Sequence, residues 1–79
     1  MDWRTHIHTD PAILAGKPVV IGTRLSVDFL LGLAGAGWTE EQILDNYPTL
    51  THESLQAVHA FAAECLRDEA FFAVSLAAS

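Results

Sequence analysis

The stretch at residues 10–27 constrains the fold most, because two turn signals and a glycine surround one short β-branched run. The dipeptide DP marks a first turn and the tripeptide GKP a second, since glycine accepts positive φ and proline fixes φ at a value that turns require. The VVI run at residues 19–21 favours extended backbone, and Gly22 ends it. We therefore expect a strand between a turn and a sharp corner.

Residues 5–10 also read as a strand, because Thr5, Ile7 and Thr9 alternate with polar residues at period two. This strand is expected to pair with the run at residues 19–21, so that residues 5–25 form a β element with turns. Residues 6, 8 and 10 (His, His and Asp) would share one face and supply candidate metal ligands. Solvated histidines on an edge strand are the commoner arrangement, so we expect no metal and no other cofactor.

Three helices are expected to follow, over residues 26–37, 39–47 and 51–75. The second has the fullest start signal: Thr39 and Gln42 form a capping box, and Trp38 and Ile43 have the spacing of a hydrophobic staple. Ser26 and Thr51 are the expected N-caps of the other two helices, and Gly37 is the expected C-terminal cap of the first. The fold class is thus mainly α, with a short N-terminal β element.

The first helix contains an unexplained glycine, Gly32, which lowers helix propensity by about 1 kcal/mol relative to alanine. Because apolar residues surround it, we expect this helix to be buried on most sides. Packing explains the GLAGAG spacing better than a phosphate loop does, since the glycines lie inside a helical pattern.

The third helix lacks Gly and Pro and is longer than a domain of this size needs. Its apolar stripe continues into Phe71, Phe72, Val74 and Leu76. We predict that these four residues form a homodimer or partner interface; the alternative is a C-terminal end that folds back or frays.

Composition agrees with a small chain that associates. The 79 residues allow a single domain, 51% are hydrophobic, 18% are charged, and the net charge is −6. This charge opposes contact with phosphate backbones unless the few cations gather on one face. The lone cysteine, Cys65, is expected to be an inert core thiol, and a cytoplasmic, soluble, unprocessed protein without a membrane span is predicted.

The order of these motifs resembles one known family. The spacing I-L-x-G-K-P-x-x-x-G-T-R-x-x-V, a Gly-rich helix, a T-E-E-x-I-L segment, a Tyr-Pro pair and a Leu-Thr pair before a long helix are similar to domain-of-unknown-function family 433. The resemblance covers residues 7–66. Two positions depart from it: Ala15 replaces a frequent glycine, and Ile21 stands where arginine is often found.

This resemblance implies a helix-turn-helix bundle of homeodomain or winged-helix type. It also implies a VapB-like antitoxin encoded beside a PIN-like ribonuclease toxin. In such a unit the start of the third helix would enter the major groove, which makes His52 and Gln56 candidate nucleic-acid contacts. Lys17 and Arg24 flank the corner and are the likelier basic contacts of the two pairs.

Two alternatives remain open for these residues. Arg24 is either a contact residue or a structural one that pairs with Asp10 or Asp28 or bonds the last carbonyls of a helix. The helices are either a DNA-reading unit or a purely structural bundle, and Glu53 disfavours the first.

Neither of two candidate catalytic motifs is complete in the sequence. The zinc-protease pattern that begins at His52 and Glu53 requires histidine where Gln56 stands, and the phosphate-loop pattern at Gly16 and Lys17 fails at residue 18. We therefore expect a non-enzymatic binding protein, either an antitoxin or a dimeric interaction module that binds no nucleic acid. DNA binding by the isolated chain should be weak.

Overall fold

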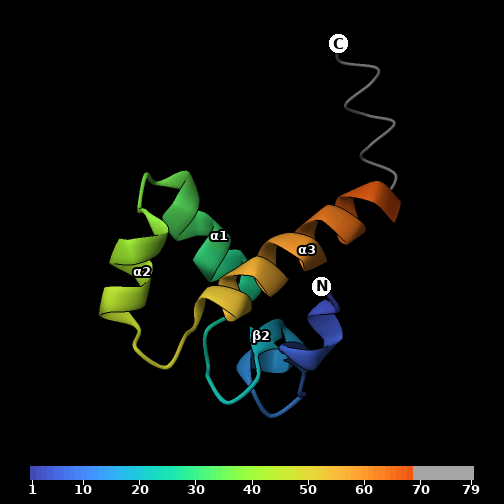
Figure 1. Ribbon diagram of the computed structural model, residues 1–79. Helices are drawn as coiled ribbons and strands as arrows, with labels where there is room; N and C mark the ends of the chain where they lie inside the picture. The colour runs from blue at the N-terminus through green and yellow to red at the C-terminus, as the bar shows by residue number, and fades with distance from the viewer. Residues whose placement is uncertain (69–79) are drawn as a thin grey trace.

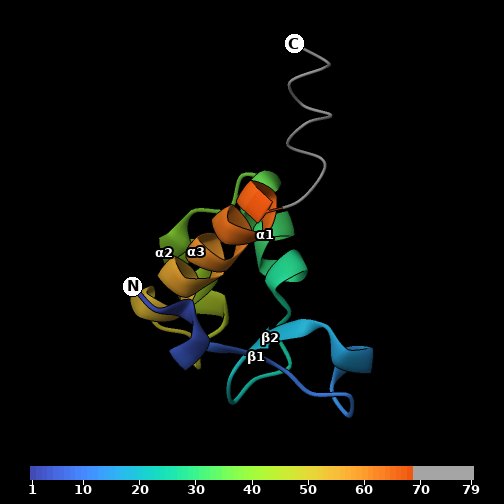
Figure 2. The ribbon, with the colours of Figure 1, turned by 90° about the vertical axis from the view of Figure 1, so that its right-hand side faces the viewer.

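The computed structural model describes residues 1–68 of the chain. Along the sequence they form η1 (Trp3–Thr5), β1 (Ile7–Thr9), η2 (Leu14–Gly16), β2 (Pro18–Val20), α1 (Val27–Gly35), α2 (Glu40–Asn46) and α3 (His52–Asp68). The three helices lie together, and the paired strands lie at one end of them (Figures 1 and 2). The predicted mainly α fold with a short N-terminal β element is confirmed. The expected continuation of the third helix to residue 75, with Phe71, Phe72, Val74 and Leu76, lies outside the described residues.

The two strands pair antiparallel, as predicted, with Ile7 opposite Val20 and His8 opposite Val19. The strand expected over residues 5–10 is wrong at its ends. Thr5 belongs to η1, because the Asp2 carboxylate accepts a hydrogen bond from the backbone N–H of Arg4 (3.1 Å) and caps a 3-10 turn there. At Thr5 the cap formed by Asp2 thus decides the backbone conformation, and the alternation of residues at period two does not.

The corner after β2 depends on Gly22, which has φ +83°. A Cβ at this position would meet no atom within 4 Å, so the backbone conformation alone requires glycine. The Thr23 hydroxyl then donates to the carbonyl of Val20 (2.8 Å) and accepts from the N–H of Leu25 (3.0 Å). These bonds turn the chain back toward β2 and set the start of α1.

All three predicted helix caps are confirmed. Ser26 accepts from the N–H of Phe29 (3.2 Å), and Thr51 accepts from the N–H of Ser54 (3.1 Å). Thr39 and Gln42 make both bonds of the capping box, 2.8 and 3.1 Å. These bonds satisfy amide groups that would otherwise lack partners at the helix starts.

The α1 helix ends as its glycine predicts. Gly37 has φ +97°, its N–H donates to the carbonyl of Ala34 (3.1 Å), and the N–H of Trp38 donates to the carbonyl of Leu33 (3.0 Å). This is the bond pattern of a Schellman motif. It frees the chain to turn into α2 after only a few residues.

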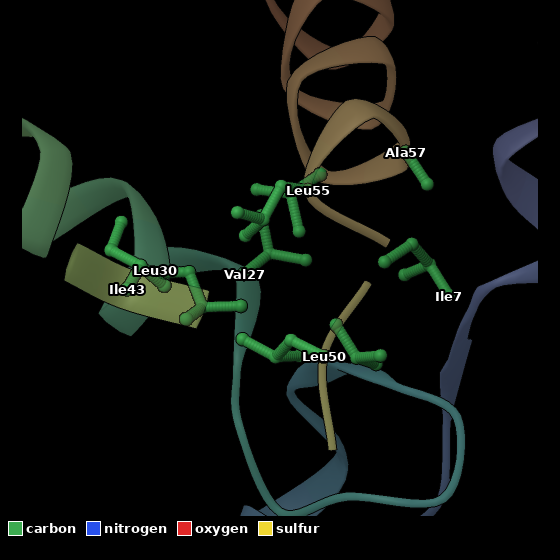
Figure 3. Close-up of a cluster of buried hydrophobic side chains, with 9 residues drawn as sticks. Ile7, Val27, Leu30, Ile43, Leu50, Leu55 and Ala57 are labelled. Atoms are coloured by element: carbon green, nitrogen blue, oxygen red, sulfur yellow. The ribbon is translucent and has the colours of Figure 1, made fainter. Parts of the chain in front are cut away.

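The core lies where the β element meets all three helices (Figure 3). Val19, Leu30 and Val58 are its most deeply buried large side chains and come from β2, α1 and α3. The remaining buried apolar residues of the core are Ile7, Val20, Val27, Ile43, Leu50, Leu55 and Ala57. One continuous core therefore joins the β element to the helices.

The expectation that α1 is buried on most sides is wrong. Only Val27 and Leu30 of this helix are buried, whereas Phe29 is 42% exposed. A Cβ on Gly32 would meet no atom within 4 Å, so no close packing within the chain requires this glycine. A large face of α1 is open because β2 and α3 cover the helix from one side.

The N-terminus is held against α3 by contacts that the sequence did not predict. The Trp3 indole N–H donates to the Glu64 carboxylate, and the ring packs edge-on against Phe61 with centroids 4.8 Å apart. The Arg4 guanidinium lies over the Trp3 ring and bonds Glu64 at 3.3 Å. The Trp3 hydrogen bond, helped by Arg4, holds the pKa of Glu64 below its usual value.

Candidate functional site

A groove of about 510 Å³ opens at the corner between the β element and the start of α1. We call it the corner groove; its lining residues are Leu14, Lys17, Arg24, Leu25, Ser26, Asp28 and Phe29. Two of the four predicted nucleic-acid contacts, Lys17 and Arg24, therefore meet in one groove. Leu14 and Phe29 are each 42% exposed, so the groove offers apolar surface as well as positive charge.

The two cations of the corner groove, Lys17 and Arg24, differ in whether a carboxylate of the described residues pairs with them. Lys17 pairs with Asp28 at 3.3 Å, both side chains being well exposed. The hydrogen bond from Ser26, aided by Lys17, holds the pKa of Asp28 below its usual value. Among the side chains of residues 1–67, no carboxylate lies within 4.0 Å of the Arg24 guanidinium.

The predicted pairing of Arg24 with Asp10 or Asp28 is therefore wrong. Asp28 is taken by Lys17, and the Asp10 carboxylate accepts from the N–H of Ala12 (2.9 Å) in the turn that it opens. In the described part of the chain, Arg24 also makes no bond to a helix carbonyl. Within the part of the chain that the structure describes, its charge therefore has no carboxylate partner.

The rim of the corner groove has an unusual backbone. Leu14 and Ala15 both have left-handed conformations, with φ +49° and +56°, and Gly16 follows with φ +83°. The left-handed conformation costs an ordinary L-residue about 1–2 kcal/mol. This chain therefore keeps the turn at Ala15 without glycine, the residue type that suits a left-handed conformation best.

The other predicted contacts, His52 and Gln56, lie outside the corner groove, at the exposed start of α3. His52 Nδ1 lies 2.8 Å from a Glu40 carboxylate oxygen, a contact that joins the starts of α3 and α2. Glu40, with a smaller contribution from Glu53, raises the pKa of His52. The predicted set is thus divided between two places.

We call the exposed carboxylates at these two helix starts, Glu40, Glu41 and Glu53, the acidic face. They favour the positive ends of the helix dipoles and stabilise α2 and α3. They also surround His52 and Gln56 with negative charge. The position that reads DNA in a helix-turn-helix unit is therefore electrostatically unfavourable for phosphate in this chain.

A second groove, of about 280 Å³, lies between α1 and the later turns of α3. We call it the apolar groove; its lining residues are Pro18, Val27, Asp28, Leu31, Phe61, Ala62, Cys65 and Leu66. Leu66 is 54% exposed, and Cys65 is half-buried rather than a core thiol as predicted. The sequence stripe on α3 identified these residues but not their exposure.

No group of three or more His, Cys, Asp or Glu side chains in residues 1–68 is arranged to hold a metal ion. Among the helices of this same part, none is long and apolar enough to cross a bilayer.

The family profile described as protein of unknown function (DUF433) matches residues 7–62. The match includes both strands, α1, α2 and most of α3, and the chain belongs to this family. No curated protein and no solved structure matches the chain significantly.

Proposed function

We propose that this DUF433 member is the antitoxin half of a toxin–antitoxin pair, a cytoplasmic, non-enzymatic binding protein that neutralises a PIN-like ribonuclease. The observation that carries the proposal is the acidic face. Glu40, Glu41 and Glu53 are exposed and cluster where α2 and α3 begin. This surface suits a cationic protein partner better than a nucleic acid.

The argument is one of charge complementarity. A ribonuclease must hold the phosphates of its substrate, so its substrate groove is cationic. A surface of fixed carboxylates on two capped helices competes for such a groove and accelerates the encounter through the net charge of −6. The resemblance to VapB-like antitoxins supports the same partner class.

Contact with DNA takes a secondary place in this proposal. The corner groove contains Lys17 and Arg24, but Lys17 is already paired with Asp28. Two cations in the corner groove, of which only Lys17 is paired within the described residues, neutralise few phosphates, so the isolated chain should bind duplex DNA weakly and with a shallow salt dependence. A basic toxin would supply the missing charge, and the complex would bind the shared promoter.

Calorimetry with the product of the neighbouring reading frame tests the antitoxin role. Full-length chain should bind it, and E53Q should weaken binding several-fold, with a larger loss for E41Q/E53Q. A63K is the matched control for E53Q, because each raises the net charge by one at an exposed position of α3. Equal losses for E53Q and A63K would show a general charge effect and contradict a specific acidic interface.

The second candidate is a dimeric protein-interaction module that binds no nucleic acid. The apolar groove favours it, since Leu66 on its lining is 54% exposed. A chain that dimerises but binds neither the neighbouring protein nor DNA, alone or together, would favour this module over the antitoxin.

A further inference from the structure

The corner groove and the apolar groove adjoin along the open side of α1. Asp28 lines both, while Lys17 lines the first and the next residue, Pro18, lines the second. A ligand lying along α1 would therefore meet apolar side chains near α3 and cations near the corner. This surface has two chemically different ends in a fixed order.

The apolar end leaves hydrophobic surface exposed at Leu66. Phe61 and Leu31 already pack against the core, but Leu66 at the edge of the groove is 54% exposed. Removal of this apolar surface from water favours a complex. Small domains bury a limited fraction of their surface, so covering this groove would add materially to stability.

The sequence of residues 69–79 matches the two grooves, because it offers one negative charge and then a run of apolar side chains. It reads EAFFAVSLAAS: one carboxylate at Glu69, and then Phe71, Phe72, Val74 and Leu76 with no further charge. We propose that this segment of a second copy of the chain occupies the two grooves. Glu69 faces Lys17 and Arg24, and the apolar side chains fill the groove between α1 and α3.

A second copy fits better than the same chain. The apolar groove is lined by Cys65 and Leu66, which lie only a few residues before the segment begins. To fold back, the chain would have to reverse at once, yet residues 69–79 contain no Gly, Pro, Asn or Asp. A reciprocal exchange between two copies needs no such reversal, and it completes each groove with residues of the partner. The inference is independent of the antitoxin role.

A matched pair of variants on α3 tests the groove. Ala62 lines the apolar groove and Ala63, its neighbour, is exposed outside it. The full-length chain should sediment as a dimer of 8.6 kDa subunits. A62E should raise the dissociation constant at least tenfold, whereas A63E, with the same charge and helix propensity, should leave it unchanged. Circular dichroism checks that both fold.

Two results of this experiment would overturn the inference. One is a wild-type chain that is monomeric at micromolar concentration. The other is A62E dimerising as tightly as A63E.

The single cysteine allows the partner segment to be located directly. Wild-type chain, whose only thiol is Cys65, is mixed with C65S/F72C and oxidised mildly. The inference predicts a disulfide between Cys65 of one copy and residue 72 of the other, identified by peptide mass. C65S/Q56C is the control, because Gln56 is exposed on α3 outside both grooves.

Oxidation of the single variant F72C, which keeps Cys65, distinguishes the alternatives when it is compared with the mixture. A disulfide between residues 65 and 72 that forms only within the single variant F72C, and never between mixed chains, would show that the segment folds back on its own groove. That result, or a cross-link no more frequent than with the Gln56 control, would overturn the proposal.

Discussion

The corner groove and the acidic face are built in opposite ways. At the acidic face, Thr39 and Gln42 form a complete capping box and the carboxylates oppose the helix dipole favourably. At the corner groove, Leu14 and Ala15 have left-handed backbone and the Arg24 charge has no carboxylate partner within the described residues. Local signals thus agree with one another at the acidic face, whereas backbone strain and a cation without a carboxylate partner in the described residues occur together at the corner groove.

The largest expected effect concerns the core that joins the two regions. Leu30 is 2% exposed and Leu14 is 42% exposed. L30A should lower the free energy of unfolding by about 2–5 kcal/mol, since it removes methyl groups and leaves a cavity. L14A should cost far less. Urea denaturation measures both, and similar losses would mean that the corner is as much a part of the core as α1.

The corner itself should be sensitive at Gly22. G22V should lower the free energy of unfolding by more than about 1 kcal/mol, because a β-branched residue is poorly compatible with φ +83°. No neighbouring atom would clash with its Cβ, so the loss comes from the backbone. Thermal melting of G22V and G22A checks this: equal stability of wild type and G22A would contradict the conformational requirement.

One substitution should strengthen the strained rim. A15G should raise the free energy of unfolding by about 0.5–1 kcal/mol, since the relief of a left-handed alanine exceeds the entropy that glycine adds to the unfolded chain. The same change at exposed Ala34, inside α1, should lower stability by about 1 kcal/mol. Effects of the same sign at both positions would refute the assignment of strain to the corner.

The smallest expected effect is a pH dependence at the acidic face. Because Glu40 raises the pKa of His52 in the folded chain, this contact adds stability below the usual histidine value of 6.5 and loses it as pH rises through the raised pKa. NMR titration should show the His52 pKa falling toward its usual value in E40Q. An unchanged pKa in that variant would mean that Glu40 does not hold the imidazolium.

The sequence predicted the parts of the fold that local chemistry decides. Ser26, Thr39 and Thr51 identified the helix starts because each cap is a bond between residues three apart. Gly22 and Gly37 marked the positive-φ corners because glycine, which has no Cβ, adopts that backbone conformation readily. The pairing of the strands followed from β-branched residues on either side of two turn signals.

Contacts between distant parts of the chain could not be predicted in this way. Trp3 bonds Glu64 across most of the chain, and His52 bonds Glu40 from another helix. The open side of α1 was also missed, since apolar residues around Gly32 are compatible with burial by this chain or by a partner. The sequence left open whether Arg24 is a contact residue or a structural one, because only the structure shows that Lys17 pairs with Asp28.

The proposed function assigns the start of α3 to an acidic, protein-binding face that does not read DNA by itself. Gel shifts on promoter DNA at physiological salt, with the full-length chain alone and with the co-expressed neighbouring protein, test it most directly. We expect weak binding without sequence preference for the chain alone, and tighter, specific binding for the complex. Tight, sequence-specific binding by the isolated chain, lost in Q56A, would contradict the claim.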